Sequence, residues 1–195
     1  MANIAHNPLL FISDLHLQDT RPDLTDALVR FLTEHAGTCE ALYVLGDLFE
    51  YWLGDDTHNT FVSRVHAAFR NFTQSGSELF LMHGNRDFLI GEHFIARCGA
   101  QLIQEPHRLN TTLGDIILLH GDSLCTDDLD YQRFRTMVRR PEWQSDFLAK
   151  SMKERALFAQ QARGQSKEVT GKKREEILDV NHQAVLDCFR SNCCP

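Results

Sequence analysis

Apolar runs that end in polar residues recur along the first 122 residues. The run 9–12 leads into Ser-Asp-Leu-His at 13–16, and the runs 41–45, 79–82 and 116–119 lead into Gly, Asp, Asn or His. Short apolar runs bounded by turn residues are typical of buried strands. Polar side chains at the carboxyl ends of such strands lie where open α/β sheets bind ligands. The pattern therefore predicts a sheet with one polar, ligand-binding edge.

Segments with helical periodicity lie between these runs. Apolar residues recur at helical spacing over about 22–36 and 57–75, each stopped by a glycine, and a shorter helix is expected over 91–98. Two later strand patterns, 107–112 and 115–119, are joined at Leu113-Gly114, which is a hairpin signal. This order predicts an α/β fold in which helices flank a mixed sheet.

The chain changes character after residue 126. Residues 127–190 are expected to be almost entirely helical, with breaks near Pro141, Gly164 and Gly171. Residues 133–174 carry twelve Lys and Arg against four Asp and Glu, although the whole chain has a net charge of −7. Aromatic, Met and Leu side chains are interspersed with these basic residues. We therefore separate a core, residues 1–126, from a basic and apolar helical insertion, residues 127–190.

Composition limits the function classes. A chain of 195 residues with 43% hydrophobic and 24% charged residues suits a globular protein with one sizeable core. The net negative charge argues against a nucleic-acid partner. No signal peptide is expected at residues 1–6, and no window is apolar enough for a membrane span. The six cysteines form no Cys-x-x-Cys pair, so reduced thiols in a cytosolic protein are expected.

Four polar blocks carry the candidate chemistry. They are Asp14-x-His16, Gly46-Asp47, Gly84-Asn85-Arg86-Asp87 and His120-Gly121-Asp122. Taken singly, each has an ordinary interpretation as a helix cap, a turn or a satisfied histidine. Taken together, each after a strand, they fit a site for two divalent metals, in which one carboxylate is shared.

Local geometry refines this expectation. On a regular strand Asp14 and His16 would point to one face, because side chains alternate. Gly46 and Gly84 would let the backbone turn and free the following side chain to project.

In this order the blocks resemble the calcineurin-like metallophosphoesterases. Most members of that family have His where this chain has Arg86. The arginine, and the sequences 11–17, 46–52 and 120–126, are similar to the family of UDP-2,3-diacylglucosamine hydrolases of lipid A biosynthesis in Gram-negative bacteria. The resemblance covers essentially the whole chain. It implies a calcineurin-like mixed β-sandwich with a helical cap insertion over 127–190.

The resemblance also implies a reaction and the residues that perform it. UDP-2,3-diacylglucosamine would be cleaved at its α-phosphorus to UMP and 2,3-diacylglucosamine 1-phosphate by a water that two Mn²⁺ ions activate. One metal would be held by Asp14, His16 and Asp47, and the second by Asp47, Asn85 and His120. Arg86 would bind phosphate, because a guanidinium fork suits that task. Its ordinary interpretation is a salt bridge, for example to Asp87.

Substrate contacts also carry over from the family. Asn85 and Arg86 are joined in this role by cap residues, and these are Asp128, Ser166, Thr170 and Lys173. Ordinary interpretations remain open: Asp128 could simply begin a helix, and the run 172–174 could be a solvated basic run. The apolar side chains of the basic insertion could hold acyl chains or pack the helices together.

Two further expectations concern the membrane and the chain end. Basic charge and a lipid substrate predict peripheral association with the cytoplasmic face of the bacterial inner membrane. The family pattern ends with Gly-His-Thr-His after a further strand, and residues 191–195 would begin that segment, which these 195 residues do not contain. Each metal would then lack one ligand. Activity could be lost, and the alternatives are another metallophosphoesterase, such as a nucleotide pyrophosphatase or phosphodiesterase, or a non-catalytic lipid-binding scaffold.

Overall fold

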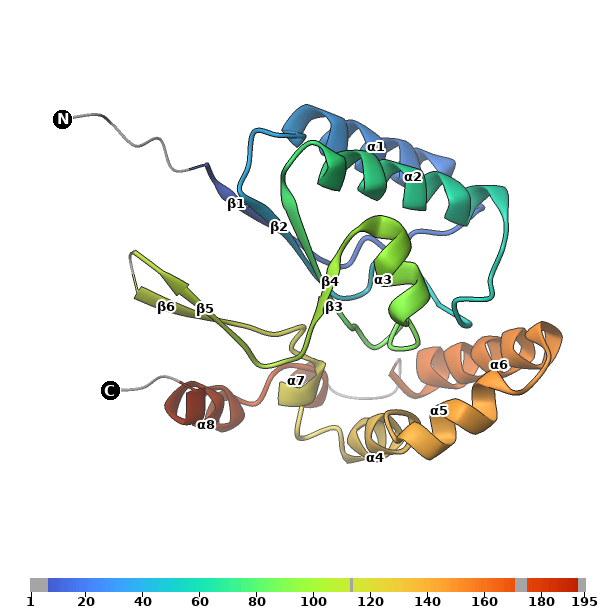
Figure 1. Ribbon diagram of the computed structural model, residues 1–195. Coiled ribbons are helices and arrows are strands. Elements are labelled where there is room, and N and C mark those ends of the chain that lie inside the picture. Colours follow the sequence, from blue (N-terminus) through green and yellow to red (C-terminus); the bar gives the residue numbers. More distant parts are fainter. Residues whose placement is uncertain (1–6, 113, 171–174, 193–195) are drawn as a thin grey trace. The chain divides into compact units, whose positions relative to one another are not determined.

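The computed structural model describes residues 7–112, 114–170 and 175–192, which divide into two compact units, Met1–Gln104 and Glu105–Pro195 (Figure 1). The first unit alternates strands and helices. Its elements are β1 (Leu9–Ile12), α1 (Pro22–His35), β2 (Ala41–Leu45), α2 (Thr60–Gln74), β3 (Glu78–Met82), α3 (Glu92–Cys98) and β4 (Gln101–Ile103). The predicted order of strands and helices is therefore confirmed.

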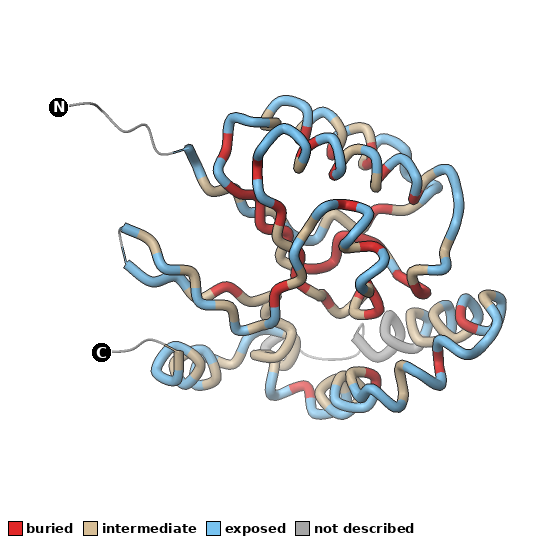
Figure 2. Tube along the Cα trace, viewed as in Figure 1, coloured by how far each residue is buried: buried red, intermediate tan, exposed pale blue. Residues whose placement is uncertain are grey.

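The four strands of the first unit form one parallel sheet in the order β1-β2-β3-β4. Because sequential parallel strands are joined by right-handed crossovers, the connecting helices lie on one face. Figure 1 shows α1 and α2 side by side over the sheet. Strand β2 is the most buried strand, and the apolar side of α2 is also buried (Figure 2). The core includes Leu42 and Val44 of β2 and Val65 and Phe69 of α2, which are fully inaccessible to solvent.

The other face of the sheet carries a row of aromatic rings. Phe11, Tyr43 and Phe80 occupy neighbouring positions in the register of β1, β2 and β3. The ring centroids of Phe11 and Tyr43 are 5.2 Å apart, and those of Tyr43 and Phe80 are 4.7 Å apart, both stacked. The three rings hold the strands in register on the side opposite the helices.

The second unit begins with a hairpin and continues with helices. Its elements are β5 (His107–Thr111), β6 (Gly114–Leu118), η1 (Asp122–Leu124), α4 (Leu129–Val138), α5 (Pro141–Leu148), α6 (Met152–Thr170), α7 (Glu175–Leu178) and α8 (His182–Asn192). The hairpin is confirmed, and so is the helical character of those residues of 127–190 that the structure describes. The prediction of a single mixed sheet is not confirmed. Among the described strands, β5 and β6 pair antiparallel with each other and form a separate sheet.

The predicted helix break at Gly164 is wrong. Helix α6 runs through this position from Met152 to Thr170. A glycine inside a helix costs only about 0.5–1 kcal/mol relative to alanine, which a 19-residue helix tolerates. The break lies earlier, at 149–151, where Ser151 begins α6 by exchanging hydrogen bonds with Glu154. Gly171 lies outside the described residues.

Helices α5 and α6 pack through three aromatic rings. Trp143 stacks on Phe147 at 4.8 Å between centroids, and Phe158 contacts both rings. Phe147 is almost fully buried. These side chains therefore pack helices together, which is the ordinary interpretation of the apolar residues in the insertion. Met137, Leu148 and Leu157 remain exposed.

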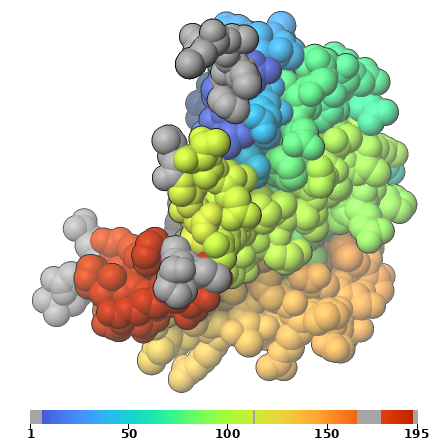
Figure 3. Space-filling view, turned by 60° about the vertical axis from the view of Figure 1, so that its left-hand side comes forward, coloured from blue at the N-terminus to red at the C-terminus, as the bar shows by residue number. Residues whose placement is uncertain are grey.

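Helix α8 contributes no buried residue, and Figure 3 shows it as a red segment at the molecular surface. Its Val185 and Phe189 are exposed. Across the described residues, none of the helices has both the length and the apolar character that crossing a bilayer requires. The four described cysteines, 39, 98, 125 and 188, are unpaired, as expected of reduced thiols.

Candidate metal centre

The first candidate ligands lie beyond the strand and not on it. Strand β1 ends at Ile12, and both Asp14 and His16 have positive φ angles, 56° and 47°. The expectation that they alternate along a regular strand is therefore wrong. Among the described residues, Asp47, with φ 53°, is the only other non-glycine residue with a positive φ angle. Such conformations cost of order 1–3 kcal/mol each and cluster at functional sites.

Backbone hydrogen bonds hold this strained segment in place. The Asp14 N–H donates to the Gly46 carbonyl at 3.2 Å, and the His16 N–H donates to the Asp47 carbonyl at 3.0 Å. The loops that follow β1 and β2 therefore run side by side. As a result, the side chains of the first two sequence blocks converge at the carboxyl edge of the parallel sheet.

The converging side chains fit a single divalent metal ion. His16 Nε2 lies 3.9 Å from Asp14 Oδ1 and 3.8 Å from Asp47 Oδ2, and one ligand atom from each residue lies within 4.8 Å of the others. Metal bonds to nitrogen or oxygen are about 2.0–2.2 Å long, so two atoms on one ion are separated by at most about 4.4 Å. Both His16 distances satisfy that limit. Two carboxylates and one imidazole suit manganese, iron or zinc.

The third block packs directly against Asp47. The N–H of Arg86 donates to Asp47 Oδ1 at 2.9 Å. A Cβ atom on Gly84 would lie only 2.1 Å from that same oxygen. Gly84 is therefore required because the backbone passes so close to Asp47, which adds to its expected role of letting the backbone turn. Asn85 is half-buried and lies between Gly84 and Arg86 in the sequence. It is thereby brought to the sheet edge that holds the triad of Asp14, His16 and Asp47.

Asp87 holds the loops together, a role that its sequence block alone does not indicate. Its carboxylate is inaccessible to solvent and accepts hydrogen bonds from the N–H groups of Gly84 at 2.8 Å and Leu48 at 2.7 Å. Burial is the main reason why the pKa of Asp87 is raised to about 6. The ordinary interpretation of Arg86 as a salt-bridge residue is confirmed with a carboxylate other than Asp87, because its guanidinium pairs with Glu50.

Glu50 also joins the centre without having been predicted. One carboxylate oxygen lies 3.1 Å from His16 Nδ1, not aligned for a hydrogen bond, and the other lies 3.8 Å from an Arg86 guanidinium nitrogen. Its side chain is 13% exposed. A carboxylate behind a metal-binding imidazole orients the ring and raises its basicity. The signal in the sequence was an acid three residues after Asp47.

The remaining predicted residues lie in the second unit. His120 is half-buried after β6, and its backbone N–H donates to Glu105 at 3.0 Å. Asp128 is mostly buried and caps α4 by accepting from the Tyr131 N–H at 3.0 Å, so its ordinary interpretation as a helix start is confirmed. The side chains of Ser166 and Thr170, and Lys173 as a whole, lie outside the described residues.

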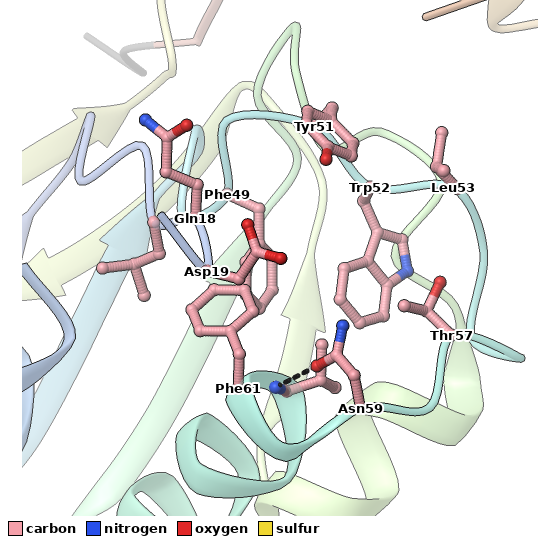
Figure 4. A pocket seen from close by; sticks show the side chains of 11 residues that line it. Gln18, Asp19, Phe49, Tyr51, Trp52, Leu53, Thr57, Asn59 and Phe61 are labelled. Carbon is pink, nitrogen blue, oxygen red and sulfur yellow. Dashed lines mark hydrogen bonds between the residues drawn. The ribbon is translucent and has the colours of Figure 1, made fainter. Parts of the chain in front are cut away.

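A small cavity lies among the residues that follow His16 and Glu50 (Figure 4). Aromatic rings of Phe49, Trp52 and Phe61 line it, and Asn59 at its edge caps α2 by accepting from the Val62 N–H. Its volume of about 60 Å³ is room for a few water molecules. Sites for drug-sized ligands take at least about 300 Å³, so this cavity does not account for binding of a lipid-linked nucleotide.

Comparison with known proteins agrees with the geometry. A profile of calcineurin-like phosphoesterases matches residues 8–184. The chain is 46% identical over 177 residues to a UDP-2,3-diacylglucosamine hydrolase of Marinobacter nauticus, an alignment that covers 91% of this chain and 72% of that protein. Proteins of the same name from Hahella chejuensis and Chromobacterium violaceum are each 45% identical, over 94% and 95% of this chain and 75% and 78% of theirs. The chain belongs to the calcineurin-like phosphoesterase family, a family of metal-dependent hydrolases, in the branch of proteins named UDP-2,3-diacylglucosamine hydrolase.

Proposed function

We propose that this chain hydrolyses UDP-2,3-diacylglucosamine at the α-phosphorus in lipid A biosynthesis, releasing UMP and 2,3-diacylglucosamine 1-phosphate. The observation that carries the proposal is the packing of the Arg86 segment against the Asp14–His16–Asp47 triad. It places a permanent cation beside a metal-binding cluster, which suits a phosphoric anhydride. The names of the curated relatives support the same substrate.

The metals would be two Mn²⁺ ions. Asp14, His16 and Asp47 would hold one, and Asp47, Asn85 and His120 would hold the other. When bound, such a pair supplies an activated water and neutralises charge on the diphosphate. The mixture of carboxylate, amide and imidazole donors is compatible with manganese.

Arg86 would stabilise negative charge that develops on the phosphoryl oxygens. Its guanidinium stays protonated, so it serves as an electrostatic group and not as a general acid. Attack at the α-phosphorus expels a phosphate monoester, which is stable as an anion and needs no proton donor. Glu50, 3.8 Å from the guanidinium, would keep Arg86 from swinging away when substrate is absent.

We also propose that the helical unit brings the chain to the cytoplasmic surface of the inner membrane. Support comes from the basic block 133–174 and from the exposed side chains of Met137, Leu148 and Leu157. Only part of the charge is free for lipid headgroups, because Arg155 is buried and donates to the Lys150 carbonyl. Cosedimentation with vesicles tests this: binding should require anionic lipid and weaken with salt. Equal binding to zwitterionic vesicles would contradict it.

Hydrolysis is tested by Mn²⁺-dependent UMP release from the diacylated substrate, with Asp47→Ala as the main variant. Loss of the shared ligand should reduce turnover by roughly 10³-fold or more and weaken Mn²⁺ binding measured by calorimetry. Glu34→Ala, which removes an exposed acid on α1, is the matched control and should change neither.

Two outcomes would contradict the proposal at different levels. Equal turnover of UDP-glucosamine lacking acyl chains would show that the chain acts on nucleotide diphosphates in general and is not specific for the lipid. Unchanged Mn²⁺ binding by the Asp47→Ala variant would refute the metal centre itself.

A further inference from the structure

One side of helix α4 contacts the segment that contains His120. Tyr131, Gln132, Arg135 and Arg139 recur at spacings that bring them to the same side of the helix. Tyr131 donates its hydroxyl to Asp122, and Arg139 lies 3.9 Å from the same carboxylate. Gln132 donates to the backbone carbonyls of Asp122 and Cys125. The segment 120–125 is therefore held against α4 by side chains of that helix and by Arg139 at its C-terminal cap.

Arg135 is at the centre of these contacts because it joins two carboxylates on either side of His120. Its Nε donates to Asp122 Oδ2 at 2.9 Å, and one of its terminal nitrogens donates to Glu105 Oε1. The other oxygen of Glu105 accepts the backbone N–H of His120 at 3.0 Å. A continuous path of hydrogen bonds thus leads from the arginine through Glu105 to the backbone of His120.

The three charged groups on this path are largely removed from solvent. The side chains of Asp122, Glu105 and Arg135 are 7%, 11% and 21% exposed. Removing one partner from a buried ionic cluster is strongly destabilising locally, because it leaves the remaining charges uncompensated. Without Arg135, two partly buried carboxylates would repel each other, and Glu105 would lose the group that holds it beneath the His120 N–H.

We propose that Arg135 is a positioning residue for His120: by clamping Glu105 and Asp122, it fixes the His120 backbone where metal binding needs it. The inference rests on the proposed function, in which His120 is a metal ligand. It adds a connection between the substrate and the metal ligand, because Asp128, a predicted substrate contact, caps α4, and the same helix bears Arg135 two turns later. A displacement of α4 by bound lipid would therefore reach the metal ligand through this clamp.

The test is calorimetric titration of the intact chain with Mn²⁺, with His120→Ala to identify the binding event that depends on this ligand. Arg135→Met should weaken that same event by about 10–100-fold, the size expected for groups that orient metal ligands, and leave other Mn²⁺ binding unchanged. Arg135→Lys should not restore it, because an ammonium cannot reproduce the planar fork between two carboxylates. Arg133→Met is the matched control, since Arg133 is on the same helix, is 78% exposed and pairs with Asp130.

A second variant keeps the inference testable where Arg135→Met disturbs folding. Glu105→Gln retains an oxygen for the His120 N–H but weakens the link to Arg135, and it should weaken the His120-dependent event by a smaller factor. The double variant should cost less than the sum of the two single changes, because both act on one path. Circular dichroism checks that each variant remains folded.

The named outcomes separate this inference from the proposed function. Wild-type metal affinity in both Arg135→Met and Glu105→Gln would overturn the inference, and so would an equal loss with Arg133→Met. If His120→Ala leaves Mn²⁺ binding unchanged, the ligand assignment fails and the inference fails with it. A chain that does not hydrolyse the lipid but shows the Arg135 effect on Mn²⁺ would contradict the substrate alone and support the clamp.

Discussion

The strand-end loops of the first unit and the helices of the second unit hold their polar side chains in different ways. In the loops, Asp14, His16 and Asp47 adopt positive φ angles and take part in backbone hydrogen bonds between segments that are distant in the sequence. In the helices, Asp128 and Glu154 make their contacts within three residues, as helix caps. A long-range network therefore positions the first group, whereas local structure positions the second.

The difference has a physical reason. A metal ion requires its ligand atoms within a few tenths of an ångström of fixed positions, so the backbone that carries them must be rigid even at the cost of strain. A surface that accepts flexible acyl chains needs apolar area and tolerates movement. The comparison predicts that small changes in the strand-end loops disturb function and folding together, and that similar changes at the helix caps and at exposed helical positions do not.

A pair of glycine substitutions provides the strongest test of this contrast. In Gly84→Ala the new Cβ would lie 2.1 Å from Asp47 Oδ1, so the loop must move; we expect the free energy of unfolding to fall by about 1–3 kcal/mol and Mn²⁺ binding to weaken severely. In Gly164→Ala a Cβ would have no atom within 4 Å, and the free energy of unfolding should rise by about 0.5–1 kcal/mol.

Urea unfolding and Mn²⁺ titration measure both substitutions. Effects of the same sign and size at the two positions would break the contrast, because both changes are chemically identical and only their surroundings differ. A stable Gly84→Ala variant with normal Mn²⁺ affinity would show that the loop after β3 adapts without disturbing Asp47.

A pair of glutamate substitutions, one in a strand-end loop and one at a helix cap, tests the same contrast with an effect of intermediate size. Glu50→Gln removes the charge 3.1 Å behind His16 and 3.8 Å from Arg86, so Mn²⁺ affinity should fall by roughly 10–100-fold with the fold intact. Glu154→Gln changes only the acid that caps α6 through Ser151 and should leave Mn²⁺ affinity unchanged. Calorimetry measures the affinities, and unchanged binding by the Glu50→Gln variant would remove this residue from the metal centre.

The sequence predicted what depends on local pattern and chemistry. Apolar runs, glycine stops and the hairpin signal gave nearly all elements, and the block order identified Asp14, His16 and Asp47 before the structure brought them together. The amphipathic pattern of α2 is an example, because Val65 and Phe69, at helical spacing, are among its buried residues.

What the sequence did not show depends on contacts between distant segments. Glu50 and Asp87 are ordinary acids until the fold places one behind His16 and buries the other under two loops. Gly84 was assigned a turn, but it also leaves room for Asp47. The error at Gly164 has the opposite cause, since a weak local preference was overridden by the helix around it.

A histidine pair gives the smallest test of the contrast. His66 on α2 packs against Phe94, its Nε2 is buried with no hydrogen-bond partner, and its pKa is lowered, mainly by desolvation and further by Arg97. The folded chain therefore resists protonation of this ring more than the unfolded chain does. Stability is lost as the pH falls from the unfolded pKa of about 6.5 towards the lower folded pKa. Replacing His66 with Gln should flatten this dependence in urea unfolding at pH 7.5 and 5.0. Replacing the exposed His182 of α8 with Gln should leave it unchanged, and an equal effect of the two substitutions would show that burial of His66 does not govern its titration.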